Sequence, residues 1–187
     1  MRYYRIILSL FLFTCITFFC SGSTIEPFII KPERRINYYN NKGLLYLEDG
    51  FYFAAITSFK IALGINPNSA ASAPTYDNLG KAYLKTDEPQ MAQECFEAAI
   101  LFSPNNFQYY FNLVQSYKNQ NILEKKLTTK NYRVEESYKP IVTGLILIAL
   151  GEEREGKKIL KNFANKEPAM IISKQISVFL ESHISDL

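Results

Sequence analysis

The residues that could do chemistry in this 187-residue sequence are few and scattered. The single histidine, His183, lies close to the C-terminus, where chain ends usually fray. No Ser or Cys stands near it in a nucleophile arrangement, and no glycine-rich phosphate loop follows a predicted strand. Beyond the first 23 residues only Cys95 remains, so neither an intrachain disulfide nor a four-ligand zinc site is expected there. We therefore predict no enzyme activity, no metal and no cofactor.

Composition favours helices. Apolar residues make up 48% of the chain and charged residues 21%, as in ordinary globular proteins. There are 13 Tyr and 14 Phe, but Gly and Pro number only 8 each, too few for a turn-rich β fold. The formal net charge is +3, and without Arg2 and Arg5 it falls to +1, from 19 basic and 18 acidic side chains. A near-neutral chain gives no electrostatic reason to expect a nucleic-acid partner.

Residues 1–23 have the pattern of an export signal. Arg2 and Arg5 precede an almost unbroken apolar run, Ile6–Phe19, and small residues follow it. The run has 14 residues, whereas a membrane span needs about 20. We predict a leader over 1–23 and a linker over 24–35. An uncleaved N-terminal anchor is the alternative.

Cys20 ends the apolar run and is followed by Ser-Gly-Ser, so the leader resembles a bacterial lipoprotein signal. Phe19 departs from the small residue usual before that cysteine, and Cys15 is a weaker second candidate. The resemblance implies that Cys20 is lipidated and that the protein is exported and membrane-associated on the periplasmic side of the cell envelope. The alternative is cleavage after Ser23, which would give a soluble periplasmic protein without lipid.

Two segments of the body repeat the same residue types at a displacement of 37 residues. The first set is Tyr39, Lys42, Gly43, Tyr46, Ala55, Phe59, Ala62 and Pro67; the second is Tyr76, Leu79, Gly80, Tyr83, Ala92, Phe96, Ala99 and Pro104. This order resembles the tetratricopeptide repeat family, whose pattern is an aromatic residue, Leu-Gly, Tyr, Ala, Phe and Pro. Lys42 departs from the pattern, and both units carry Tyr in place of Trp.

The resemblance implies an all-α fold, a short right-handed solenoid of helix-turn-helix units. Repeats are expected over about 36–69 and 73–106, with helices at 36–48, 52–65, 73–85 and 89–102. The small residues Gly43 and Gly80 are expected to face Ala55 and Ala92, so that the two helices of each unit approach closely.

The pattern weakens after the second unit. A partial repeat is expected over 107–122, followed by a polar segment, 124–133, that is interpreted as a solvated linker. A degenerate repeat is expected over 137–170, because Gly144 precedes Pro168 by the same interval that separates Gly43 from Pro67. There Gly156 takes the place of the Ala, and Leu160 takes the place of the Phe. A last helix within 169–185 has Ile172, Ile176, Phe179 and Leu180 on one face and resembles the capping helix of such arrays.

The stretch Ile141–Leu150 is apolar except for Thr143 and Gly144. Ten residues are too few to span a bilayer. Such a stretch is either a helix buried on all sides or a helix whose outer face is a docking surface. Burial is favoured, because a helix that is apolar all round is normally interior.

The family resemblance also implies where a partner would bind, since the first helices of successive repeats line the binding face. The predicted partner-binding residues are Asn40, Asn41, Leu44, Asp77, Asn78, Lys81, Phe111, Asn112 and Gln115. Amide side chains can bind a peptide backbone without reading its sequence, while Leu44 and Phe111 offer apolar contact. Only Asn78 matches the carboxylate-binding pattern of co-chaperone members of the family, so that clamp is absent. We expect a scaffold that binds another protein or a peptide segment and aids envelope protein assembly; a structural or sequestering protein is the alternative.

Overall fold

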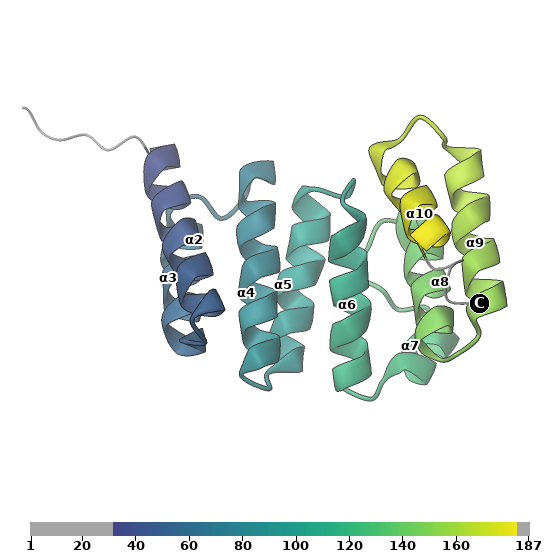
Figure 1. Cartoon of the computed structure of the whole chain (residues 1–187), viewed down its shortest axis with the longest axis horizontal. Helices are drawn as coiled ribbons and strands as arrows, with labels where there is room; N and C mark the ends of the chain where they lie inside the picture. The colour runs from purple at the N-terminus through teal and green to yellow at the C-terminus, as the bar shows by residue number, and fades with distance from the viewer. Residues whose placement is uncertain (1–31, 183–187) are drawn as a thin grey trace, which may run out of the picture. The chain divides into compact units, whose positions relative to one another are not determined.

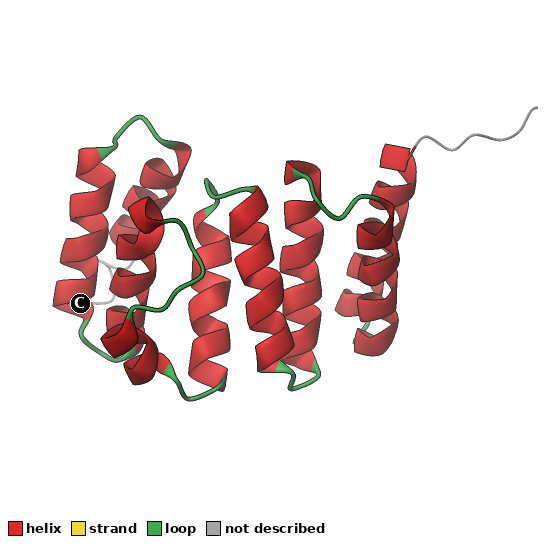
Figure 2. Ribbon diagram, turned by 180° about the vertical axis from the view of Figure 1, so that it is seen from behind, coloured by secondary structure: helices red, strands yellow, loops and turns green. Residues whose placement is uncertain are grey.

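The computed structural model describes residues 32–182, which form nine α-helices, two short 3₁₀ helices and no strand (Figures 1 and 2). The predicted all-α class is confirmed. The α-helices are α2 (Pro32–Glu48), α3 (Tyr52–Ile65), α4 (Ala73–Lys85), α5 (Pro89–Phe102), α6 (Phe107–Asn119), α7 (Leu123–Thr129), α8 (Lys139–Ala149), α9 (Glu153–Lys166) and α10 (Ile171–Ser182). The 3₁₀ helices are η1 (Ala70–Ser72) and η2 (Glu136–Tyr138). The predicted leader with Cys20, and also His183, lie outside the described residues.

The helices pack as consecutive pairs. The tightest neighbours are α2 with α3, α4 with α5, and α8 with α9, and successive pairs join where α3 meets α4 and α5 meets α6. The predicted bounds of α3, α4 and α5 match the structure. Helix α2 instead begins at Pro32, four residues before the expected start at Ile36, so the predicted linker 24–35 ends in helix. Proline suits a helix's first turn, where the missing N–H costs nothing.

One turn geometry connects the two helices of all four units. A residue with positive φ ends each first helix: Gly50 (80°), Asp87 (60°), Asn121 (56°) and Gly151 (90°). The N–H of the next residue then donates to a carbonyl five positions back. The pairs are Phe51 to Tyr46 (2.8 Å), Glu88 to Tyr83 (2.9 Å), Ile122 to Tyr117 (3.0 Å) and Glu152 to Leu147 (2.9 Å). This Schellman-type bond satisfies carbonyls that the helix end leaves unpaired.

In the first and second units, a glycine on the first helix lets the two helices approach each other across an aromatic ring. A Cβ added to Gly43 would lie 2.5 Å from the ring of Phe59, and one added to Gly80 would lie 2.6 Å from Phe96. The nearest neighbour of each glycine is thus a Phe ring, while Ala55 and Ala92, which were expected to face the glycines, are fully buried. The space left by the missing Cβ is filled by the larger Phe side chain four residues further along the second helix.

In the fourth unit the two helices approach each other in the same way, but the side chain opposite the glycine is a leucine. A Cβ on Gly144 would lie 2.9 Å from Cγ of Leu160, which stands in the position predicted for it. A Cβ on Gly156 would lie only 2.5 Å from the backbone oxygen of Gly144. The backbones of α8 and α9 therefore touch without a ring between them.

The third unit is completed by a short second helix. Helix α7 has seven residues, and α8 packs more on α6 than on α7. The prediction of a solvated linker over 124–133 is wrong in part, because Tyr132 is buried and its hydroxyl accepts a hydrogen bond from Thr143 Oγ1 (3.4 Å). Lys126 Nζ also lies 4.7 Å from the centre of the Tyr117 ring. Buried aromatic rings thus hold this polar segment against the array.

Apolar side chains of α8 and α10 close the C-terminal part of the core. Burial of the stretch Ile141–Leu150 is confirmed, because most of its side chains are buried and the rest are half-buried. Helix α10 packs on α9 and buries Ile172 and Ile176 completely. The apolar face predicted for this last helix therefore packs on α9, and the helix reaches back toward α6.

Candidate partner-binding face

The nine predicted binding residues lie on α2, α4 and α6, and we call the surface that they form the first-helix face. Asn41 is exposed, Asp77 and Asn112 are buried, and the others are half-buried. The sequence therefore located the residues on neighbouring helices. It did not show that two of the polar ones are withdrawn from solvent.

Hydrogen bonds join these polar side chains from one first helix to the next. Asn78 Nδ2 donates to Asn40 Oδ1 (3.2 Å), which links α4 to α2. Asn112 Nδ2 donates to Asp77 Oδ1 (2.7 Å), which links α6 to α4. We call these two bonds the amide ladder. Side chains that the sequence suggested for a partner are thus used to hold the helices together.

The carboxylate of Asp77 is fully engaged inside the array. Its Oδ1 accepts the ladder bond, and its Oδ2 lies 2.6 Å from the Nζ of Lys81. Asn112 is likewise engaged at both ends of its amide, because its Oδ1 accepts a hydrogen bond from Gln108 Nε2 (2.9 Å). The side chains with most remaining capacity for a partner are therefore Asn41, Leu44, Phe111 and Gln115.

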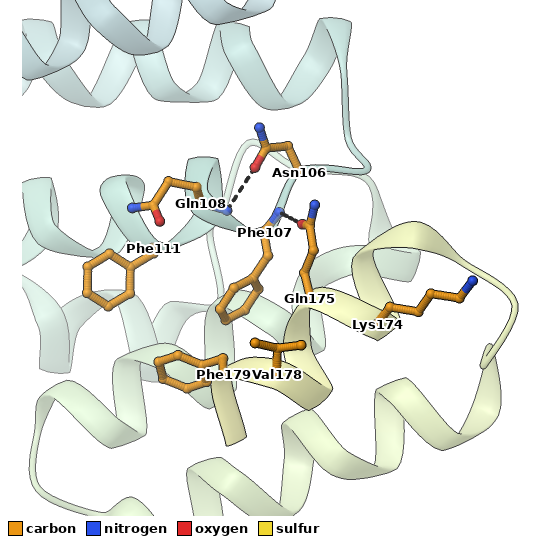
Figure 3. A pocket seen from close by; sticks show the side chains of 8 residues that line it. All are labelled: Asn106, Phe107, Gln108, Phe111, Lys174, Gln175, Val178 and Phe179. Atoms are coloured by element: carbon orange, nitrogen blue, oxygen red, sulfur yellow. Dashed lines mark hydrogen bonds between the residues drawn. The ribbon is translucent and has the colours of Figure 1, made fainter. Parts of the chain in front are cut away.

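The first-helix face is continuous, through Phe111, with an open pocket of about 590 Å³ between the start of α6 and α10 (Figure 3). The residues that line it are Asn106, Phe107, Gln108, Phe111, Lys174, Gln175, Val178 and Phe179. The rings of Phe107 and Phe179 lie 5.2 Å apart, and Val178 is mostly exposed. The volume suits a large side chain and its neighbours.

Two hydrogen bonds hold the α6 side of this pocket in place. Asn106 caps the helix by accepting from the N–H of Gln108 (3.1 Å). The side chain of Gln175 on α10 accepts from the N–H of Phe107 (2.7 Å). Helix starts leave such N–H groups without intrahelical partners, so α10 both caps α6 and forms the second wall.

Sequence reasoning missed the contribution of α10. It placed Phe179 on an apolar face, but it did not bring Lys174, Gln175 or Val178 next to α6. The only sequence signal was that apolar face itself. Nothing local shows that the helix reaches back across 68 residues to the start of the third unit.

The residues with possible reactivity in the described part are structural. Cys95 is buried, and burial raises the pKa of its thiol to about 12, so little of the reactive thiolate forms. Glu97 is also buried; burial raises the pKa of its carboxyl, although the hydrogen bond from Gln93 and the charge of Arg133 oppose the shift. Neither group lines the pocket beside α10. Within residues 32–182 no three His, Cys, Asp or Glu side chains gather in a metal-binding group.

A second pocket of about 450 Å³ lies between α9 and α10 and is edged by four cations, Arg154, Lys157, Lys158 and Lys161. Two of them form ion pairs on their own helix, Lys157 with Glu153 (3.0 Å) and Lys158 with Glu155 (3.4 Å). This pattern is typical of a solvated helix face. We assign it no binding role.

Among the described residues, no helix has both the length and the apolar character that crossing a membrane requires.

Comparison with known proteins bears on the repeats. The family profile described as "Tetratricopeptide repeat" matches residues 73–106, which are the bounds predicted for the second unit. A chloroplastic tetratricopeptide repeat domain-containing protein of Arabidopsis thaliana, PYG7, is 34% identical over 68 residues. That match covers 36% of this chain and 22% of the length of PYG7.

Among solved structures, the chain is similar to MamA, with 22% identity and a TM-score of 0.49 over 72% of this chain and 79% of that one. It is also similar to a Pseudomonas aeruginosa structure from a study titled as a functional characterization of pilF, with 17% identity and a TM-score of 0.49. That match covers 81% of this chain and 77% of the other.

Proposed function

We propose that this tetratricopeptide-type helical repeat protein is an interaction scaffold that holds a short segment of another protein on the first-helix face. Repeats of this type commonly mediate protein–protein interaction. The observation that carries the proposal is the pocket beside Phe111, where α6 and α10 meet. It is a concavity at one end of a surface that otherwise consists of amides, Leu44 and the ion pair of Asp77 with Lys81.

The lining of the pocket indicates the chemistry of the segment. Phe107, Phe111 and Phe179 supply aromatic surface, and Val178 adds an exposed apolar contact. Amides and one ammonium group form the remaining lining, so polar backbone atoms on either side of the anchor can find partners. The segment we propose carries one large apolar residue between polar or small ones.

The amide ladder limits how the rest of the segment is held. Because Asn78 and Asn112 already bond to the preceding helices, they stabilise the face more than they bind the partner. Backbone hydrogen bonds to the segment would come from Asn41 and Gln115, which remain at the surface. The partner is therefore anchored mainly by apolar contact beside α10 and aligned by amides along α2 and α6.

A peptide library tests this proposal. Short random peptides would be selected on the full chain and then titrated against Phe111→Ala/Val178→Ala and against the control Leu101→Ala. Leu101 is an exposed leucine on α5, away from the first-helix face. We expect selected peptides to share a large apolar residue and to lose about tenfold or more in affinity for the double variant, or about 1.4 kcal/mol. Equal binding to all three proteins would place the binding surface elsewhere.

The cellular setting is part of the proposal and depends on the sequence alone. We propose that the chain acts on the periplasmic side of a bacterial envelope, attached to the membrane through lipid on Cys20, and that it supports envelope protein assembly. Labelling with a radioactive fatty acid tests the attachment: Cys20→Ser should lose the label and leave the membrane fraction. A variant that is processed and fractionates like the parent would contradict the lipid attachment and leave simple secretion or an N-terminal anchor in its place.

A further inference from the structure

Helices α4 and α6 share three positions, one that bonds to the preceding first helix and two flanking ones that are buried. In α4 they are Thr75, Asn78 and Ala82, and in α6, 34 residues later, they are Tyr109, Asn112 and Ser116. The asparagine at the middle position donates the ladder bond to the preceding first helix in both cases. The flanking side chains are almost inaccessible: Thr75 is 2% exposed, Ala82 0%, Tyr109 5% and Ser116 0%.

Helix α2 presents the corresponding side chains to solvent. The equivalent positions, 37 residues before those of α4, are Tyr38, Asn41 and Leu45, and we call them the end face. Tyr38 is 58% exposed and Leu45 is 61% exposed. Within residues 32–182 no helix precedes α2 to cover them. Large apolar side chains gathered on an exposed face often mark an interaction surface, and this face carries two of them.

We propose that a second copy of this chain covers the end face, through a two-fold contact between the two α2 helices. A two-fold contact places the same patch on both sides, so the patch must be compatible with itself. The end face meets this condition. A carboxamide both donates and accepts, so Asn41 can pair with Asn41 of the second copy, with the apolar side chains packed around the pair.

Charge does not oppose this contact. From Ile36 to Leu47 the only charged side chain is Lys42, and its Nζ lies 5.6 Å from the centre of the Tyr46 ring on the same helix. In a two-fold contact along this part of the helix, therefore, no row of like charges would face the same row of the second copy. Helix α2 is roughly 25 Å long, and with the adjoining α3 it offers a footprint in the range of a small specific interface.

The other end of the array favours a closed dimer over a growing chain of copies. At the other end the outermost helix, α9, exposes mainly charged and amide side chains, among them Arg154, Lys158 and Lys161. A head-to-tail contact would need an apolar surface at that end, and repeated head-to-tail contacts give filaments. Self-association therefore joins α2 to α2 and stops at two copies. The pocket beside α10 and the α4 and α6 parts of the first-helix face stay free in each copy, whereas Asn41 is used by the dimer contact.

Sedimentation velocity on the full chain tests the proposal. We expect the parent to be dimeric and Tyr38→Glu/Leu45→Glu to be monomeric, with dimerisation weakened on the order of 100-fold, because each contact would then oppose like charges. Leu101→Glu, an equally exposed leucine on α5, should remain dimeric. A monomeric parent, or a double variant as dimeric as the parent, would overturn the proposal.

Cysteine cross-linking gives a second measurement that does not depend on disruptive substitutions. Leu45→Cys should form a disulfide-linked dimer under mild oxidation, since a residue near a two-fold axis meets its own copy. Leu101→Cys should not. Cross-linking at equal rates in the two variants would mean that the contact is non-specific and would overturn the proposal.

Discussion

The second and fourth units build the same helix pair from different residues. In the second unit, Gly80 leaves room for the ring of Phe96; in the fourth, Gly156 lets the backbone of α9 touch that of α8 at Gly144. Leu160 replaces the ring there. Both units keep a glycine at the crossing and the same left-handed turn between helices. The missing Cβ and the turn therefore define the unit, while the large side chain opposite the glycine can vary.

The largest effect is expected where a bulky side chain enters the crossing of the second unit. Gly80→Leu should lower the free energy of unfolding by about 2–4 kcal/mol, because the Phe96 ring already occupies the space. Thermal unfolding followed by circular dichroism measures this change. A melting temperature equal to that of the parent would contradict the contact between α4 and α5.

Adding a single methyl group should have different effects at the helix crossings of the second and fourth units. Gly156→Ala should cost about 2–3 kcal/mol, because its Cβ would meet a backbone oxygen, which cannot turn aside. Gly80→Ala should cost less, since a ring can shift by a few tenths of an ångström. Urea unfolding of both variants measures the difference. Gly64→Ala serves as the control, because a Cβ there meets nothing within 4 Å and alanine favours the helix. Equal losses at the two crossings would contradict the distinction.

The third unit meets the second at a buried carboxyl, Glu97 of α5, which lies where the polar segment joins the array. Its Oε2 is 3.6 Å from Nη1 of Arg133. Burial raises the folded-state pKa, so the folded protein holds this proton more tightly than the unfolded chain does. The contribution of Glu97 to stability is therefore fully present below the unfolded pKa and is lost as pH rises through the folded pKa.

Glu97→Gln should remove that loss and raise stability at neutral pH by about 1 kcal/mol. The ion pair given up is weak, because Arg133 is mostly exposed. Unfolding in urea at several pH values should show the advantage of the variant shrinking as the pH falls from the folded pKa toward the unfolded pKa, about 4.3, and no advantage below it. Glu94→Gln, an exposed neighbour on the same helix, is the control. A constant difference between parent and variant across pH would contradict the assignment.

The smallest effect concerns the turns, where the first and fourth units use glycine and the second uses Asp87, at φ 60°. Asp87→Gly should stabilise by about 0.5 kcal/mol, because glycine adopts this conformation without strain, although it also gains freedom in the unfolded chain. Gly50→Ala should destabilise by more, since φ there is 80°. Melting temperatures of the two variants should move in opposite directions; a shift in the same direction would contradict the shared turn.

The regular part of the fold was predictable because its contacts are local and repeated. The same residue types 37 positions apart gave the bounds of α3, α4 and α5, and the spacing of Gly144 and Leu160 located the fourth unit. The segment around α7 suggested an exposed partial helix or a loop, and a solvated linker was favoured because its sequence is polar. Tyr132 of this segment is buried by packing that no sequence period records.

The candidate site was predictable only as a set of positions. Helical periodicity places Asn78 and Asn112 on the same face, but it cannot tell whether an amide meets solvent or the preceding helix. That depends on the distance between first helices, which the packing sets. The pocket was harder to predict, because one of its walls is α10. The register of α10 against α6 is fixed by a hydrogen bond from the N–H of Phe107 to the side chain of Gln175.

That contact also bears on the order in which the parts of the chain fold during synthesis. Most of the array joins neighbours in sequence, so the pairs α2–α3 and α4–α5 can form as soon as they leave the ribosome. The N–H of Phe107, however, has to wait for Gln175, 68 residues later, before its acceptor exists. The N-terminal end of α6 therefore completes its native hydrogen bonds later than α2 to α5 do. A nascent chain released before Gln175 would keep two finished units and a third with an unsatisfied end, which quality-control proteases could recognise.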